Sequence, residues 1–143
     1  MSFEPVETLG LTIAINEKRE AYLELAKAYE HYQDELNERN NLSSMSFATL
    51  KMQEIQEEKT ETYKELKGLE AELAYRKAAN ELKEYGQAHG IHDYRDGDKT
   101  YRSLVVKKLK AEKEWKSLTI NEWRFNRYYL PVINHKLAQV GGY

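Results

Sequence analysis

Three observations predict an all-α fold for this chain of 143 residues. Glu, Lys, Leu, Ala and Arg dominate the composition, a bias typical of long helices and coiled coils. Two prolines and seven glycines leave long stretches without a helix breaker. Apolar residues also recur at alternating spacings of three and four. We therefore expect a single helical domain over residues 1–143, built as an elongated, antiparallel, coiled-coil-like hairpin or bundle of three main helices.

The first helix is predicted over residues 6–38, before a short connection rich in Asn and Ser. Lys18 fills the one gap in its apolar stripe, and three stripe positions are tyrosines. Those tyrosines allow two interpretations: their hydroxyls reach the edge of the stripe, or the stripe lines an open groove for a partner helix or small ligand. The stripe consists of Leu11, Ile15, Tyr22, Leu25, Tyr29, Tyr32 and Leu36.

A longer second helix is predicted over residues 46–85. At about 1.5 Å per residue it spans about 60 Å and is longer than the first helix. Residues 66–85 therefore need a cover, either the third helix or a second copy of the chain, and we expect self-association. The stripe consists of Met52, Ile55, Lys59, Thr62, Leu66, Leu69 and Leu73, and then shifts to Ala74, Ala78, Leu82 and Tyr85.

The glycines at 86, 90 and 97 predict a connection over residues 86–99. A basic helix follows over residues 100–130, which Pro131 ends or kinks because its ring clashes with the preceding turn. A short helix over residues 132–140 completes the chain. One alternative gives residues 91–102 a small β-hairpin that turns at the Asp-Gly pair 96–97.

Charge is divided unevenly along the chain. Residues 1–98 carry 12 basic and 21 acidic side chains, a net charge of −9, whereas residues 99–143 carry 10 and three, a net charge of +7. The basic part contains the run WKSLTINEWRFNRYY over residues 115–129. The candidate partner-binding residues are Lys107, Lys108, Lys110, Trp115, Trp123, Arg124, Arg127 and Tyr128.

Three interpretations of this run stay open. In the first, Trp115, Leu118, Phe125 and Tyr129 are core residues and the lysines form a solvated face. In the second, the run is a protein interface, because Trp, Tyr and Arg supply most interface hot spots. In the third, cations neutralise phosphates and rings stack on bases of a nucleic acid.

Metal and catalytic chemistry find little support. The absence of cysteine excludes disulfides and thiolate zinc sites. The densest set of donors is His89, His92, Asp93, Asp96 and Asp98, whose spacing fits neither a zinc helix nor a calcium loop. No phosphate-binding loop or Gly-x-Ser-x-Gly nucleophile occurs. We expect no metal, no cofactor and no enzymatic activity.

The sequence shows neither a signal peptide nor a membrane-spanning stretch, so we expect a cytoplasmic protein without membrane contact. The leading hypothesis is a non-enzymatic protein–protein interaction protein: an oligomeric helical scaffold, adaptor or inhibitor. By analogy of fold alone, such a chain suits a virus-encoded factor in the host cytoplasm. The alternative is a nucleic-acid-binding accessory protein that uses the basic third helix. A weaker alternative is an oligomer that sequesters a small ligand between protomers.

Overall fold

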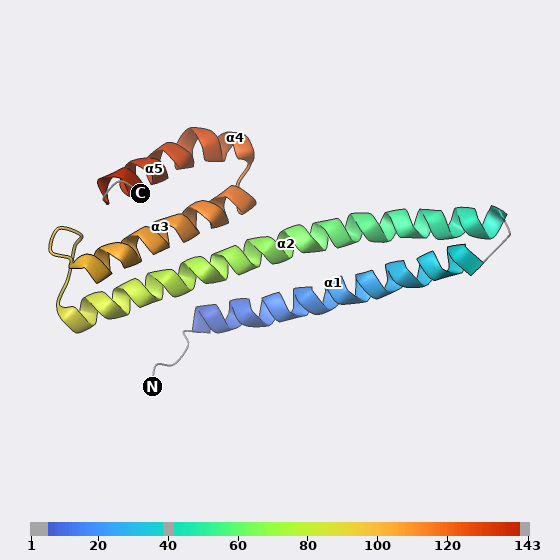
Figure 1. The fold of residues 1–143 in the computed structure, drawn as a ribbon, viewed down its shortest axis with the longest axis horizontal. Coiled ribbons are helices and arrows are strands. Elements are labelled where there is room, and N and C mark those ends of the chain that lie inside the picture. Colours follow the sequence, from blue (N-terminus) through green and yellow to red (C-terminus); the bar gives the residue numbers. More distant parts are fainter. Residues whose placement is uncertain (1–5, 39–41, 141–143) are drawn as a thin grey trace. The chain divides into compact units, whose positions relative to one another are not determined.

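The computed structural model describes residues 6–38 and 42–140, and every regular element in these ranges is helical. The prediction of an all-α fold with antiparallel helices is confirmed, and no described helix is long and apolar enough to cross a membrane. The elements, shown in Figure 1, are α1 (Val6–Glu38), α2 (Leu42–His89), α3 (Lys99–Thr119), α4 (Glu122–Arg124), the π-helical turn η1 (Phe125–Tyr129) and α5 (Leu130–Gln139).

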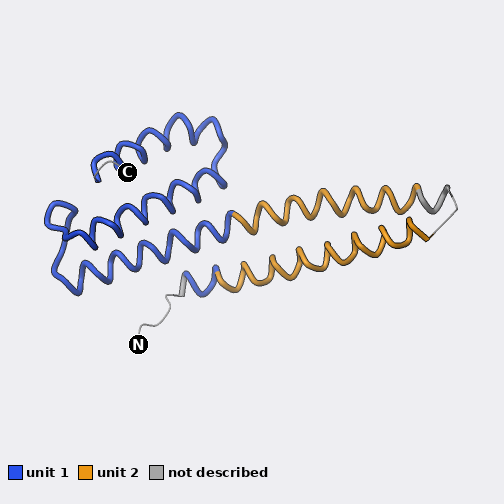
Figure 2. Tube along the Cα trace, in the orientation of Figure 1, with its two compact units in different colours: residues 1–11, 68–143 blue, residues 12–67 orange. Residues whose placement is uncertain are grey.

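The chain divides into two compact units, coloured separately in Figure 2. Unit 2 comprises residues 12–67 and is an antiparallel hairpin of α1 and the first part of α2. Ile15 and Leu66 are buried, and the other predicted stripe residues of this unit are half-buried. The predicted α1 range of 6–38 and both stripes of the hairpin are therefore confirmed.

The lysines that interrupt the two stripes are accommodated inside unit 2. Lys18 forms an ion pair with Glu65 across the hairpin. The Lys59 ammonium lies 5.3 Å from the ring centroid of Tyr22 and 5.7 Å from that of Tyr29. Aromatic faces attract an ammonium group, which a leucine at either position would not do. Tyr22 and Tyr29 of α1 thus pack as partners of Lys59 in the facing helix.

In unit 1, which comprises residues 1–11 and 68–143, α3 packs against the second part of α2. The rings of Tyr75 and Trp115 stack with centroids 5.1 Å apart. Lys107 Nζ lies 2.8 Å from Glu81 Oε2. The sequence predicts that either the third helix or a second copy of the chain covers the second part of α2. In unit 1 the third helix, α3, packs there.

Helix α2 ends four residues later than predicted. It continues through Gly86 to His89, and Gly90 then adopts a left-handed φ of 66°. The Ile91 N–H donates to the Gly86 carbonyl at 2.9 Å, a bond that closes the helix end. A side chain at Gly86 would meet the Ile91 oxygen at 3.0 Å, so this glycine permits close approach and does not stop the helix.

The β-hairpin alternative for residues 91–102 is wrong, because this segment forms turns and the first residues of α3. Asp98 determines this outcome by capping α3: its Oδ1 accepts from the Tyr101 N–H at 2.8 Å. Its Oδ2 accepts from the Tyr85 hydroxyl at 2.6 Å, which ties the cap to α2. Residues 99–102 are thereby helical.

The basic helix predicted over residues 100–130 is two pieces. Helix α3 ends at Thr119, Ile120 is extended, and Asn121 caps the next helical segment by accepting from the Trp123 N–H at 3.0 Å. The helical course then continues through η1 and past Pro131. Pro131 stands in the first turn of α5, directly after the π-helical turn, and the helical course does not end at it. The final helix begins at Leu130 and not at 132.

A cluster of buried residues lies between α3 and the segment formed by η1 and α5. Partly buried Tyr94, Val105, Ile120 and Leu130 pack against it. Its six members are Val106, Leu109, Phe125, Ile133, Leu137 and Val140. This cluster holds the C-terminal segment against α3.

We predict that Ile133→Ala destabilises the protein by about 2 to 5 kcal/mol, because the side chain is 3% exposed and its loss leaves a cavity. Its neighbour Val132 is 52% exposed, so Val132→Ala should change stability by less than about 0.5 kcal/mol. Urea unfolding followed by circular dichroism measures both. Equal effects of the two substitutions would contradict the packing of α5.

We also predict a pH dependence that originates at the α3 cap. The hydrogen bond from Tyr85 lowers the pKa of the Asp98 carboxyl, and the same bond raises the pKa of the Tyr85 hydroxyl. Asp98 therefore stabilises the fold above the ordinary carboxyl pKa of about 4, and this is lost as pH falls through its lower folded value. Tyr85 stabilises below the ordinary phenol pKa of about 10, and this is lost as pH rises through its higher folded value.

Removing the hydroxyl with Tyr85→Phe should lower the melting temperature at neutral pH and flatten both limbs of its pH profile. Tyr128→Phe is the matched control, since Tyr128 is exposed and the substitution also removes one phenolic hydroxyl. Thermal unfolding from about pH 2 to pH 11 tests the difference. Parallel profiles for the wild type and Tyr85→Phe would disprove the linkage.

Candidate functional site

Burial of Phe125 directs the side chains around it. Because Phe125 packs into the core, its neighbours on α4 and η1 point toward other sides of the segment. In η1 the backbone hydrogen bonds join residues that are five apart in the sequence, and the Leu130 N–H donates to the Phe125 carbonyl. A π-helical turn brings residues five apart closer to one line than an α-helix does, and such turns are frequent at functional sites. Trp123 and Tyr128, five residues apart, meet edge to face with centroids 5.8 Å apart.

Arg127 completes a cluster with these two rings. Its guanidinium carbon lies 5.3 Å from the Trp123 centroid and 5.9 Å from the Tyr128 centroid. Trp123 is 59% exposed and Tyr128 is 57% exposed. We call Trp123, Arg127 and Tyr128 the Trp123 cluster. It is an exposed aromatic surface whose rings and cation hold one another in place.

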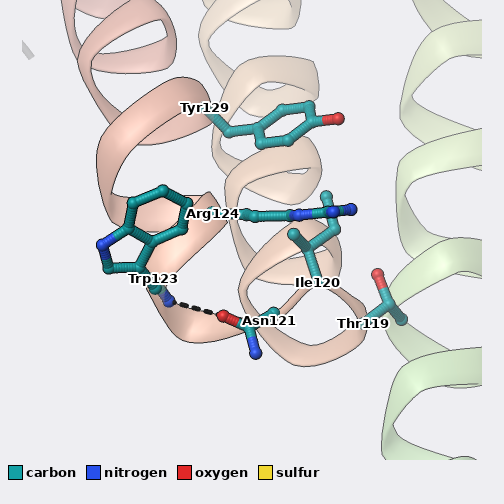
Figure 3. A pocket seen from close by; sticks show the side chains of 6 residues that line it. All are labelled: Thr119, Ile120, Asn121, Trp123, Arg124 and Tyr129. Atoms are coloured by element: carbon teal, nitrogen blue, oxygen red, sulfur yellow. Dashed lines mark hydrogen bonds between the residues drawn. The ribbon is translucent and has the colours of Figure 1, made fainter.

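A recess of about 550 Å³ lies beside the Trp123 cluster (Figure 3). Figure 3 shows the side chains of Arg124 and Tyr129 extending to one side of the segment, whereas the Trp123 ring lies on the other side. The Lys116 ammonium lies 4.9 Å from the Tyr129 centroid. The recess is lined by Thr119, Ile120, Asn121, Trp123, Arg124 and Tyr129, and we call it the Arg124 recess.

The charge of the recess is unbalanced. None of its six lining residues is acidic. Within the part of the chain that the structure describes, neither Arg124 nor Arg127 forms an ion pair, whereas Lys116 pairs with Glu112 at 2.9 Å. A guanidinium offers planar paired donors that match a carboxylate or phosphate. The recess can therefore receive an anionic group at the Arg124 guanidinium.

The other candidate residues serve internal contacts or lie apart from this surface. Lys107 pairs with Glu81, and Trp115 stacks on Tyr75. Lys108 is half-buried, and Lys110 has an interaction partner of its own. The structure thus brings together Trp123, Arg127 and Tyr128 and places Arg124 next to them, whereas Lys107 and Trp115 contact α2.

The core interpretation of the run at 115–129 is correct for Phe125 alone. Leu118 is 51% exposed, Tyr129 is partly exposed and Trp115 is half-buried. The sequence reasoning missed the turn at residues 119–121, which shapes the recess. The signal was present, because an Asn followed by Glu is typical of a helix start.

The dense set of potential metal ligands does not assemble. Across residues 6–38 and 42–140, no three His, Asp or Glu side chains gather as a group that could hold a metal ion. Instead His89 stacks on Tyr85 with centroids 4.0 Å apart, and Asp98 caps α3. These residues therefore have roles in the connection between α2 and α3.

The remaining evidence on function comes from comparison with known proteins. No protein-family model, curated protein or solved structure matches the chain.

Proposed function

We propose that this chain is a non-enzymatic interaction protein, a helical scaffold, adaptor or inhibitor that binds a protein partner through the Trp123 cluster. The observation that carries the proposal is the exposure of Trp123 and Tyr128 around Arg127. Trp, Tyr and Arg are the residue types in which interface binding energy concentrates. A monomeric helix surface has no packing reason to expose them together.

The cluster is organised before any partner binds. Tyr128 contacts the Trp123 ring at its edge, and Arg127 lies over both rings. Side chains held in one arrangement lose less conformational entropy on binding than free ones do. The rigid aromatic pair therefore suits an anchor at the centre of an interface.

A protein partner is favoured over the nucleic-acid alternative. Neutralisation of phosphates requires several available cations, but Lys107 and Lys116 already face carboxylates in unit 1. The guanidinium of Arg127 also occupies one face of the Trp123 ring, where a base would stack. The remaining exposed side chains suit a protein contact anchored by aromatic residues better than a binding site along a nucleic-acid backbone.

Self-association would account for a second set of exposed side chains, on the helices of unit 2. This hairpin has two helices, and two helices bury less apolar surface than a bundle does. A second copy could cover apolar residues that project from it. Those residues are Ile13, Leu23, Phe47 and Leu50.

The central prediction concerns Trp123→Ala. With the chain immobilised and exposed to lysate of its native cells, wild type should retain a protein partner that Trp123→Ala loses, an affinity loss of about thirtyfold or more. Leu118→Ala removes a similarly exposed apolar side chain and should retain that partner. Mass spectrometry of the retained proteins is the measurement.

Two further measurements accompany this experiment. Circular dichroism should show unchanged helicity in Trp123→Ala, because the side chain lies outside the core. Binding of the retained partner should survive nuclease treatment and depend only moderately on salt, since a phosphate contact gives a steep dependence. Identical protein sets for wild type, Trp123→Ala and Leu118→Ala would refute the proposal.

A separate prediction addresses self-association. Light scattering should give a molar mass above that of one chain, rising with concentration, and Leu50→Glu should reduce it because a carboxylate replaces an exposed apolar side chain. Gln53→Glu adds the same charge at an exposed polar position nearby and should leave the mass unchanged. A one-chain mass at every concentration would rule out the oligomeric form of the proposal.

A further inference from the structure

The Arg124 recess indicates what kind of partner the Trp123 cluster receives. Arg124 reaches the recess from α4, beside the Tyr129 ring and next to Ile120 (Figure 3). Among the described residues no carboxylate pairs with it. Arg124 is exposed, and its planar paired donors are open to a carboxylate or phosphate that enters the recess.

The dimensions and the number of cations decide which anion fits. The recess of about 550 Å³ suits one or two side chains of a partner, and it offers one unpaired guanidinium. Lys116, the cation over the Tyr129 ring, is already balanced by Glu112. A nucleic acid would present successive phosphates that require successive free cations. A single carboxylate meets the paired donors of Arg124 and requires nothing more.

The charge of the surrounding segment supports the same choice. Residues 120–143 carry three basic side chains and one acidic side chain, a net charge of +2, and this segment contains α4, η1 and α5. A partner with the same sign is repelled from it, whereas an acidic partner is steered toward it. Complementary charge therefore selects an acidic segment among the peptides that an exposed tryptophan would otherwise accept.

We infer that the Arg124 recess binds an Asp or Glu carboxylate of an acidic segment in another protein, while an apolar residue of that segment packs on the Trp123 cluster. This inference rests on the proposed function and specifies its partner class. The recess provides selection for charge, and the cluster provides the anchor. The two parts are adjacent because Trp123 belongs to the cluster and also lines the recess.

Peptide selection tests the inference without knowledge of the natural partner. Random 12-residue peptides displayed on phage are selected on the immobilised full chain, and the enriched peptides are then titrated by fluorescence anisotropy. The expected peptides combine Asp or Glu with one aromatic or large aliphatic residue. Arg124→Gln should weaken their binding about ten- to a hundredfold, the effect of losing a hydrogen bond to a charged group. Exchange of the critical peptide Asp for Asn should cost the same and add nothing in Arg124→Gln.

The matched control is Arg95→Gln, which removes an exposed guanidinium from the connection at the other end of α3 and should change binding less than twofold. Enrichment of neutral or basic peptides, or of none, would overturn the inference. Equal binding by wild type and Arg124→Gln would do the same. Tighter, Arg124-dependent binding of a 12-nucleotide oligothymidine would assign the recess to nucleic acid. A fall in the light-scattering mass of Arg124→Gln would assign it to a second copy.

The two proposals fail separately. If Trp123→Ala loses the native partner while Arg124→Gln keeps both that partner and the selected peptides, the Trp123 cluster is an interface and the acidic partner class is wrong. If both variants keep the native partner, the proposed function falls as well. Both side chains lie outside the core, so melting temperatures close to that of wild type exclude unfolding as the cause of a loss.

Discussion

Burial of Phe125 between α3 and α5 is the contact on which the candidate surface depends. Once this ring enters the core with Val106, Leu109 and Ile133, the direction of the adjoining side chains is determined by helical geometry. The π-helical turn that begins at Phe125 then brings Trp123 and Tyr128 together on the outside. Packing within the C-terminal segment and exposure of the Trp123 cluster are thus two consequences of one buried residue.

The uneven charge of the chain is used in two ways. Part of the positive charge is neutralised inside unit 1, where Lys107 of α3 pairs with Glu81 of α2. Arg124 and Arg127 belong to the same basic segment but have no carboxylate among the described residues. The difference follows from position, because α3 packs along acidic α2, whereas α4 and η1 begin after the turn at Ile120 and Asn121. The arginines without a carboxylate partner among the described residues therefore lie in the segment that also exposes its aromatic residues.

The helices and their buried stripes were largely predictable, because they follow from spacing along the chain. The range of α1 and the stripes interrupted by Lys18 and Lys59 agree with the structure, and the third helix is one of the two covers expected for α2. The predictions of helix ends and connections after α1 were wrong. Gly86 is tolerated inside α2 because a close approach requires it, Asp98 starts a helix in place of a hairpin, and Pro131 stands in a first turn. Each outcome depends on a neighbour distant in the sequence or on where the preceding helix ends.

By itself the sequence determined the fold class, the long helices, the faces that they bury and the separation of acidic from basic residues. The tertiary structure alone decided how the aromatic residues of the run at 115–129 are divided: Phe125 to the core, Trp115 to a stack on Tyr75, and Trp123 with Tyr128 to the surface. The physical reason is that periodicity identifies an apolar face only when the other faces are polar. In this run aromatic residues stand on several faces, and the packing of α3 against its neighbours selects among them.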